Sequence, residues 1–190
     1  MRDAPERTRG YVRFRQATPS DAAAVCSMVL RCSAASLYGR FLTVVALDTA
    51  ASRLVDSLAS ETAYSWLAEV GREVVGIGTT YMFDNGSAEI ALLVEDGWQG
   101  RGVATGLLPD LVEEARIRRA PQIWATALGE RMPTIRSLAK GVGGSIRVSV
   151  SAGIAEITAD LPAPTARERR KDALRHAGAR PQRAAFRSGP

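Results

Sequence analysis

Hydrophobic and polar residues follow two different spacings along this chain, and each spacing predicts one kind of element. Short runs that alternate, or that stay apolar between turn residues, are typical of strands; apolar positions spaced three and four apart are typical of helices. The expected strands cover residues 11–16, 63–70, 73–82, 88–94, 123–128, 146–150 and 154–160. The expected helices cover residues 22–30, 34–41, a stretch after residue 48, 103–119 and 133–140.

Turn residues indicate how the central strands are connected. Gly71-Arg72 and Asn85-Gly86 separate strands 63–70, 73–82 and 88–94, and short turns of this kind join antiparallel neighbours. The helix 103–119 stands between strands 88–94 and 123–128, which favours a parallel crossover. Pro109 falls inside this helix, on the face expected to lie outward, where a bend is tolerated best. We therefore expect a mixed sheet.

Composition narrows the class of protein. The chain has 190 residues, of which 46% are hydrophobic and 24% charged, as in a globular protein with one domain. It has no apolar run long enough to span a membrane, and its charged N-terminus does not resemble a signal peptide. Two cysteines, Cys26 and Cys32, form no disulfide framework and favour a reduced, cytoplasmic protein. Both are expected to be small core residues.

The single histidine excludes several chemistries. His176 lies in a charged segment near the C-terminus, so a Ser-His-Asp triad, a Cys-His dyad and a His-rich zinc site are not expected. No metal site is predicted. Any catalysis must rest on carboxylates, hydroxyls, backbone groups and a bound cofactor or cosubstrate.

The positive net charge is confined to one end of the chain. Residues 163–190 hold eight basic and two acidic residues, which leaves 17 basic and 18 acidic residues in the remainder. We expect a flexible start at 1–10, a folded domain at 11–162 and a disordered basic tail at 163–190. The tail is read as a solvated extension; the alternative is a segment that binds nucleic acid or an acidic partner.

The stretch 88–104, AEIALLVEDGWQGRGVA, carries the chemistry. A strand ends at Val94, a loop with Gly100 and Gly102 follows, and a long helix begins directly afterwards. Glycines allow backbone N–H groups to point outward, and a helix N-terminus adds unpaired N–H groups with a positive dipole. This arrangement suits a phosphate or pyrophosphate, with Arg101 as a cation at the rim.

Residues 99–104, QGRGVA, match the pattern Q/R-x-x-G-x-G/A, so the chain resembles the GNAT superfamily of acetyl-CoA-dependent N-acetyltransferases over about residues 11–161. The resemblance implies an α/β (α+β) fold: a mixed, mostly antiparallel sheet of six or seven strands flanked by helices. Acyl-CoA would enter where two central strands splay apart. The implied acetyl-CoA contacts are Leu92, Leu93, Val94, Gln99, Gly100, Arg101, Gly102, Val103, Ala104 and Thr105.

Residues 36–41, SLYGRF, and the pair Ala88-Glu89 are similar to the bacterial protein lysine acetyltransferase (Pat-like) branch. In that branch a glutamate on the strand entering the loop is the general base, and by position it is Glu89 here. Strand alternation places Glu89 on one face with Ala91 and Leu93. Burial among apolar neighbours would raise its pKa, which suits a base; the alternative is a surface or ion-paired strand residue.

Other polar and aromatic residues near this stretch have plainer interpretations. Glu95 and Asp96 are expected to be solvated or to lie beside a helix, and Trp98 to pack against the loop. Tyr38 and Arg40 are expected to make fold contacts, with Tyr38 the candidate for the acceptor side. By analogy with the family, a backbone N–H near Leu93 or Val94 would hold the developing oxyanion.

The sequence also departs from the family pattern. Met132 stands where the family usually has an asparagine, and Ala139 stands where it often has the tyrosine that protonates the leaving thiolate. Gly143-Gly144 replaces the customary Gly-Phe. Water or a hydroxyl such as that of Ser137 would then protonate the thiolate.

Three functions compete. The first is an acetyl-CoA-dependent N-acetyltransferase whose acceptor is a primary amine, either a protein lysine or a small molecule. The alternative is a non-catalytic acyl-CoA-binding sensor, which fits the replaced asparagine and tyrosine. A nucleic-acid-associated role through residues 163–190 is the third hypothesis. No membrane partner is expected, and the protein is expected to be a monomer or a homodimer.

Overall fold

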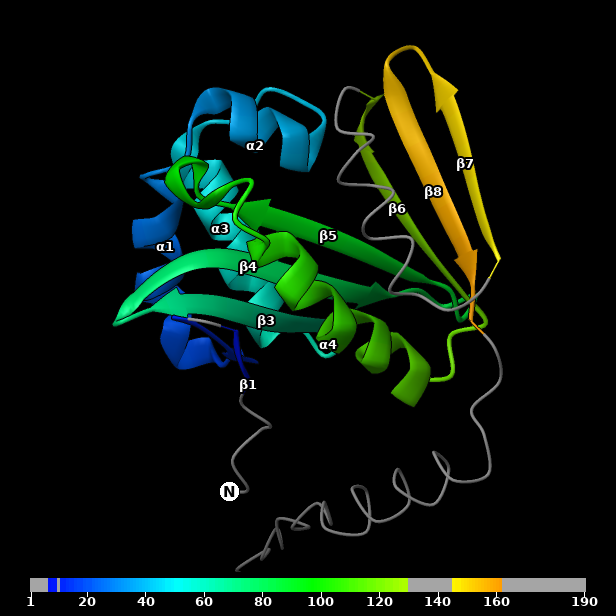
Figure 1. Ribbon diagram of the computed structural model, residues 1–190, viewed down its shortest axis with the longest axis horizontal. Coiled ribbons are helices and arrows are strands. Elements are labelled where there is room, and N and C mark those ends of the chain that lie inside the picture. The colour runs from blue at the N-terminus through cyan, green and yellow to red at the C-terminus, as the bar shows by residue number, and fades with distance from the viewer. Residues whose placement is uncertain (1–6, 10, 130–144, 162–190) are drawn as a thin grey trace, which may run out of the picture.

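The computed structural model describes residues 7–9, 11–129 and 145–161. Along the described chain, two strands are followed by three α-helices, three strands, a fourth α-helix and three more strands (Figure 1). The strands are β1 (Arg7–Arg9), β2 (Val12–Gln16), β3 (Ala63–Val70), β4 (Glu73–Met82), β5 (Ala88–Val94), β6 (Gln122–Leu128), β7 (Ile146–Ser151) and β8 (Ile154–Asp160). The helices are α1 (Ala22–Val29), α2 (Ala34–Phe41), α3 (Leu47–Ala59) and α4 (Val103–Ile117), with short 3-10 turns η1 (Pro19–Asp21) and η2 (Asp96–Trp98).

The strands form one mixed sheet in the order β1-β2-β3-β4-β5-β6-β8-β7. Every neighbouring pair in this part of the chain is antiparallel except β5 and β6, which are parallel. The expected mixed, mostly antiparallel sheet is therefore confirmed. It gains an eighth strand, β1, which lies within the ten residues expected to be flexible; the run Arg7–Arg9 contains no apolar residue that would have indicated a strand.

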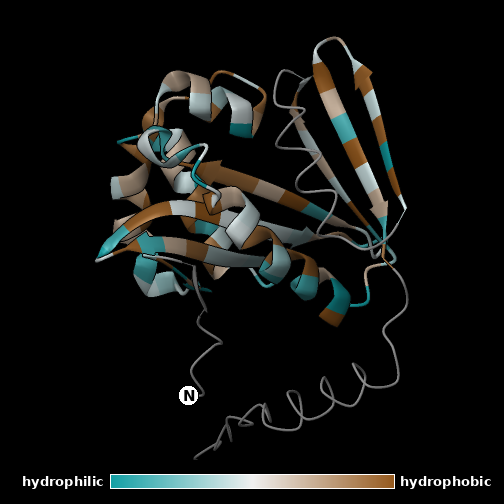
Figure 2. Ribbon diagram, in the orientation of Figure 1, coloured by the Kyte–Doolittle hydropathy of each residue, from teal (hydrophilic) through white to brown (hydrophobic). Residues whose placement is uncertain are grey.

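Helices cover both faces of the sheet (Figure 1). On one face α4 buries Leu107 and Leu111 against residues of β2 and β5 such as Phe14 and Ile90. On the other face α1, α2 and α3 share a second apolar cluster with the sheet, which includes Leu93. Figure 2 shows the apolar residues of β5, while β7 and β8 alternate hydrophobic and hydrophilic residues along their length.

The parallel pairing of β5 and β6 is brief. Only Ala88 with Ile123 and Glu89 with Trp124 are paired, and beyond them the two strands separate. Figure 1 shows β6 turning away from β5 together with β7 and β8. The expected splay between two central strands is thus present, and it opens directly after Glu89.

The expected helix and strand bounds agree closely with the structure, with small differences at helix ends. Helix α4 ends at Ile117 rather than at 119, where Arg119 takes a left-handed φ of 60°. Pro109 lies on the exposed outer face of α4, as expected, and the helix continues through it. The helix expected at 133–140 and the tail at 163–190 lie outside the described residues.

Candidate functional site

Strand β5 separates two kinds of side chain. Leu93 packs with the cluster of α1, α2 and α3, whereas Ile90, Leu92 and Val94 pack on the α4 side. This agrees with the alternation expected from the sequence. Glu89 shares the face of Leu93, so its carboxylate lies on the side of the sheet covered by α2 and α3.

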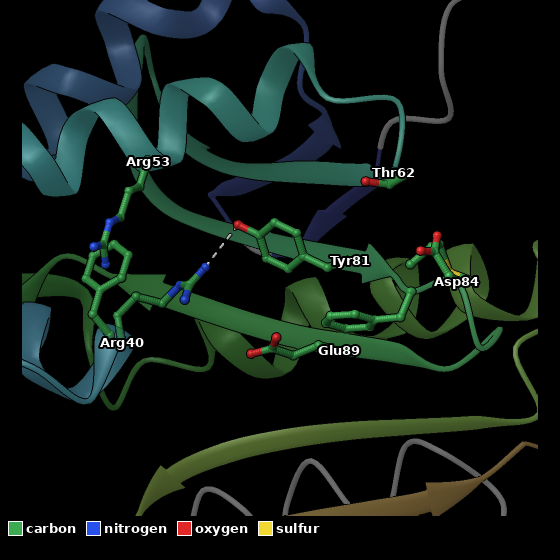
Figure 3. A pocket seen from close by; sticks show the side chains of 9 residues that line it. Arg40, Arg53, Thr62, Tyr81, Asp84 and Glu89 are labelled. Atoms are coloured by element: carbon green, nitrogen blue, oxygen red, sulfur yellow. Dashed lines mark hydrogen bonds between the residues drawn. The ribbon is translucent and has the colours of Figure 1, made fainter.

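A pocket opens over the Glu89 end of this face (Figure 3). Its volume is about 460 Å³, within the range typical of small-molecule sites. Side chains from α2, α3, β4 and β5 contribute to its wall, together with the turn between β4 and β5. The lining residues are Arg40, Phe41, Arg53, Thr62, Tyr81, Met82, Phe83, Asp84 and Glu89.

Glu89 is half-buried in this pocket. Its burial raises the pKa of the carboxyl group above the ordinary value, because the charged form loses solvation, and the positive charge of Arg40 partly opposes that rise. No ion pair joins Glu89 to a cation in the described part of the chain. Among the described residues, Glu89 is therefore not an ion-paired strand residue.

Arg40 faces Glu89 across the pocket, as Figure 3 shows. Its Nη2 donates a hydrogen bond of 3.2 Å to the Tyr81 hydroxyl, and its guanidinium lies over the Phe41 ring, 5.0 Å from the centroid. Tyr38, which was expected to make fold contacts and was the candidate for the acceptor side, is not among the residues that line this pocket. The SLYGRF segment contributes Arg40 and Phe41 instead, because they fall on the α2 face turned toward β4 and β5.

Gly100 and Gly102 have the backbone conformation that the loop requires. Their φ angles are 72° and 83°, in the left-handed region that favours glycine. Gly102 is the N-cap of α4, and the first bond inside the helix is donated by the Gly106 N–H to the Gly102 carbonyl. The N–H groups of residues 103–105 lie before this first bond, so the helix itself offers them no acceptor. They can therefore donate hydrogen bonds to an anion.

Hydrogen bonds fix the loop before α4 to the start of α2. The Gln99 side-chain amide donates to the Ser36 hydroxyl at 2.7 Å and to the Val94 carbonyl at 3.0 Å. Asp96 accepts from the Ser33 N–H at 2.8 Å and from the Ser33 and Ser36 hydroxyls at 2.6 and 2.9 Å. Partial burial raises the pKa of Asp96, but these bonds lower it more. Asp96 is thus a structural acid beside a helix, as expected.

Trp98 and Glu95 also have structural contacts. The Trp98 ring packs against Tyr11 at 5.6 Å between centroids, and Arg101 lies over it at 5.1 Å. Glu95 accepts from Arg31 Nε at 2.9 Å. Cys32 is buried, which raises the pKa of its thiol to about 11, and Cys26 is partly buried; both are free thiols. None of these residues lines the pocket.

The backbone of β5 is open toward the splay. The Glu95 N–H bonds to the Val75 carbonyl of the preceding segment at 3.0 Å, so by alternation the groups of Val94 and Leu92 face away from β4. The described ladder with β6 has already ended at Glu89. An extended, amide-rich ligand can therefore pair with β5 here, with its phosphates at the N-terminus of α4. These features fit acetyl-CoA.

A family model described as "Acetyltransferase (GNAT) family" matches residues 33–143, more than half of the chain. The chain belongs to the GNAT acetyltransferase family. The reaction of this family is acetyl-CoA-dependent N-acetylation, and the matched segment contains both the Glu89 pocket and the loop before α4. The resemblance inferred from residues 99–104 is confirmed.

Solved structures agree with the family assignment. The GNAT domain of S. lividans PAT is 25% identical, with a TM-score of 0.66 over 84% of this chain and 96% of that one. The putative acetyltransferase yncA from Salmonella typhimurium, solved with acetyl-CoA, is 21% identical, with a TM-score of 0.58 over 83% and 99%. RimL, a ribosomal L7/L12 alpha-N-protein acetyltransferase solved with CoA, is 14% identical, with a TM-score of 0.63 over 83% and 98%.

Some expectations fall beyond the described residues. Met132 and Ala139, at the usual asparagine and tyrosine positions, and Ser137 lie in the segment 130–144, as does Gly143-Gly144. Within the described ranges, no group of three or more His, Cys, Asp or Glu is placed to hold a metal ion. None of the helices described is long and apolar enough for a membrane span.

Proposed function

We propose that this GNAT acetyltransferase transfers the acetyl group of acetyl-CoA to a primary amine, with Glu89 as the general base. One observation carries the proposal: Glu89 is the last β5 residue paired with β6, so its half-buried carboxylate lies in the pocket where the splay begins. The acceptor would enter from the pocket and acetyl-CoA from the splay. Their reacting groups would meet beside Glu89.

The chemistry requires a proton acceptor. A lysine-like amine is almost fully protonated near neutral pH and must lose a proton before it attacks a thioester. A carboxylate with a raised pKa accepts that proton better, directly or through one water. Glu89 fulfils this role in the proposal. The backbone N–H of Val94 faces the splay and would donate a hydrogen bond to the carbonyl oxygen of the acetyl thioester, where negative charge develops.

The cosubstrate would be held along β5 and at the start of α4. Leu92 and Val94 would offer backbone groups to the amide-containing arm, whereas the backbone groups of Leu93 face Ile77 of β4. The pyrophosphate would accept hydrogen bonds from the loop and the first turn of α4, which comprise Gln99, Gly100, Arg101, Gly102, Val103, Ala104 and Thr105. When bound, acetyl-CoA supplies an activated acetyl group with a thiolate leaving group.

A protein amine is the acceptor that the similarities favour. The SLYGRF segment resembles the Pat-like branch, and S. lividans PAT is a structural relative. RimL, a relative in fold, is named as an acetyltransferase of a protein α-amine. The competing proposal is a non-catalytic acyl-CoA sensor, which the replacement of the usual asparagine and tyrosine by Met132 and Ala139 favours.

The variant Glu89→Gln tests the role of Glu89, because it keeps the side-chain size but removes the base. We expect kcat to fall by about 100-fold to 10,000-fold, the range of general base catalysis. Acetyl-CoA affinity, measured by calorimetric titration, should stay within about twofold. Exposed Glu73 starts β4 at the far end of the hairpin, so Glu73→Gln is the matched control.

Two other results would reject parts of the proposal. If Glu89→Gln retains turnover within about tenfold of the parent, the base is another group. If the parent binds acetyl-CoA but acetylates neither lysine peptides nor small amines, the sensor interpretation replaces the transferase.

A further inference from the structure

Two arginines line the Glu89 pocket without a carboxylate partner. Arg40 and Arg53 form no ion pair within the described ranges. Other arginines of the described domain do meet acids: Arg15 pairs with Asp21 and Glu69, Arg31 with Glu95, and Arg147 with Asp160. The two guanidinium groups therefore carry positive charge that no ion pair within the described ranges neutralises at close range.

Phe41 holds both guanidinium groups in place. Arg40 lies over its ring at 5.0 Å and Arg53 at 5.7 Å from the centroid, so the two cations share one aromatic platform. A cation–π contact uses the charge of a guanidinium and leaves its N–H groups available for hydrogen bonds. Arg40 uses one such group to reach Tyr81, and no hydrogen bond is formed by the Arg53 side chain with the described residues.

The charges of the pocket are separated. In Figure 3 Arg40 and Arg53 lie at one end, Asp84 lies at the other, and the Glu89 carboxylate points from β5 into the space between them. Two cations and two acids line the same space, so a ligand with several negative charges gains little net attraction there. An ammonium group toward Glu89 and Asp84, with one carboxylate toward the arginines, matches this arrangement.

We propose that Arg40 and Arg53 form a carboxylate-binding subsite, so that the acceptor is an amine that also carries a carboxylate. This inference rests on the proposed function, because it assigns the substrate class of the same pocket. Guanidinium groups bind carboxylates through paired N–H donors, and contact with the Phe41 ring restricts both side chains before a ligand arrives. The carboxylate belongs either to a free amino acid or to an acidic residue next to the modified amine in a peptide.

Matched pairs of amines test the subsite. Leucine, phenylalanine and lysine are each compared with their amides, and the peptide acetyl-Glu-Lys-Glu-amide with acetyl-Gln-Lys-Gln-amide. Affinity is measured by calorimetric titration of the full chain saturated with CoA, and kcat/KM is measured with acetyl-CoA. For at least one pair, we expect the acid to be preferred about tenfold to a hundredfold, the range that charge-assisted hydrogen bonds supply.

The variant Arg53→Gln should reduce this preference toward one. Arg53 is exposed on α3 and its contact among the described residues is with the Phe41 ring, so the substitution does not open the core. Arg72→Gln is the matched control: it removes the same charge from the exposed turn between β3 and β4, and should leave the preference unchanged. The free amino acids and the peptide pair distinguish the two sources of the carboxylate.

The outcomes separate the subsite from the proposed function. Acetylation of acids and amides at equal kcat/KM, or a preference that Arg53→Gln does not change, overturns the subsite while leaving the transferase intact. An Arg53-dependent preference in binding without any acetylated product supports the subsite and rejects the transferase. If no pair shows an Arg53-dependent preference in either measurement, the subsite is overturned.

Discussion

Tyr81 lies directly opposite Glu89 in the antiparallel ladder between β4 and β5, and the hydroxyl of Tyr81 accepts a hydrogen bond from Arg40. The two strands thus set the distance between the proposed base and the cation that faces it. Burial raises the pKa of Glu89 and Arg40 lowers it, so the ionisation of the base depends on how Arg40 is held.

The pH dependence of the reaction should therefore report on Arg40. A base works only when deprotonated, so kcat/KM should rise with pH through the raised pKa of Glu89. In Arg40→Gln the opposing positive charge is gone, so that pKa rises further and the acidic limb moves to higher pH. Rates measured across the pH range check this shift, with an amine substrate whose carboxylate is replaced by an amide. A limb that stays in place, as is expected for Arg72→Gln, would show that another group titrates.

The variant Gly102→Glu should abolish tight acetyl-CoA binding. It places a carboxylate at the N-cap of α4, where the pyrophosphate is proposed to lie, and gives a φ of 83° to a residue with a side chain. We expect affinity to fall by about a hundredfold or more, because like charges repel strongly at short range. Gly71→Glu is the control, since Gly71 has a φ of 62° and an added Cβ meets nothing within 4 Å. Equal affinities for both variants would place the cosubstrate elsewhere.

The variant Gly106→Ala should destabilise the fold. A Cβ at Gly106 would clash with the buried Phe14 ring of β2, against which α4 packs. We expect a loss of about 1–3 kcal/mol in the free energy of unfolding, typical of overpacking, although alanine favours a helix over glycine. Urea denaturation measures this loss. The loss should shrink in a Phe14→Leu background; an unchanged loss there would mean that Phe14 is not the obstacle.

Stability at acidic pH should depend on Asp21. The hydrogen bonds from Arg15 lower the pKa of Asp21 to about 2 from 3.8, while burial acts in the opposite direction. A group whose pKa is lower in the folded state stabilises the fold above its unfolded pKa and loses that effect as pH falls through the folded one. The free energy of unfolding should therefore decline between these two values. Asp21→Asn should flatten that decline, whereas the exposed Asp56→Asn should leave it as in the parent.

Local signals predicted most of the strands. The bounds of β3, β4, β5 and β8 agree with the expected ranges, because the turns at 71–72, 84–86 and 152–153 contain residues that tolerate a left-handed φ. The splay was predicted as a feature of the family, and the loop before α4 from its own glycines. The turns and the loop depend on residues close together in the sequence, whereas the splay was predicted from the family alone.

The pocket wall could not be predicted in this way. Arg40, Arg53 and Tyr81 belong to three different elements, and their meeting depends on how α2 and α3 cross the sheet. That placement follows from a shared apolar cluster rather than from any motif. For the same reason the sequence offered Tyr38 as the candidate for the acceptor side, whereas Arg40 and Phe41 of the same helix line the pocket.

The bonds from Gln99 and Asp96 to Ser36 and Ser33 have a consequence for redesign. They connect the loop that precedes α4 with the helix that supplies Arg40. Helix α2 therefore cannot be exchanged alone for that of another family member with a different acceptor, because the transplant would leave the two loop side chains without their partners. In redesign, residues 33–41 and 95–99 should therefore be transferred together or left unchanged.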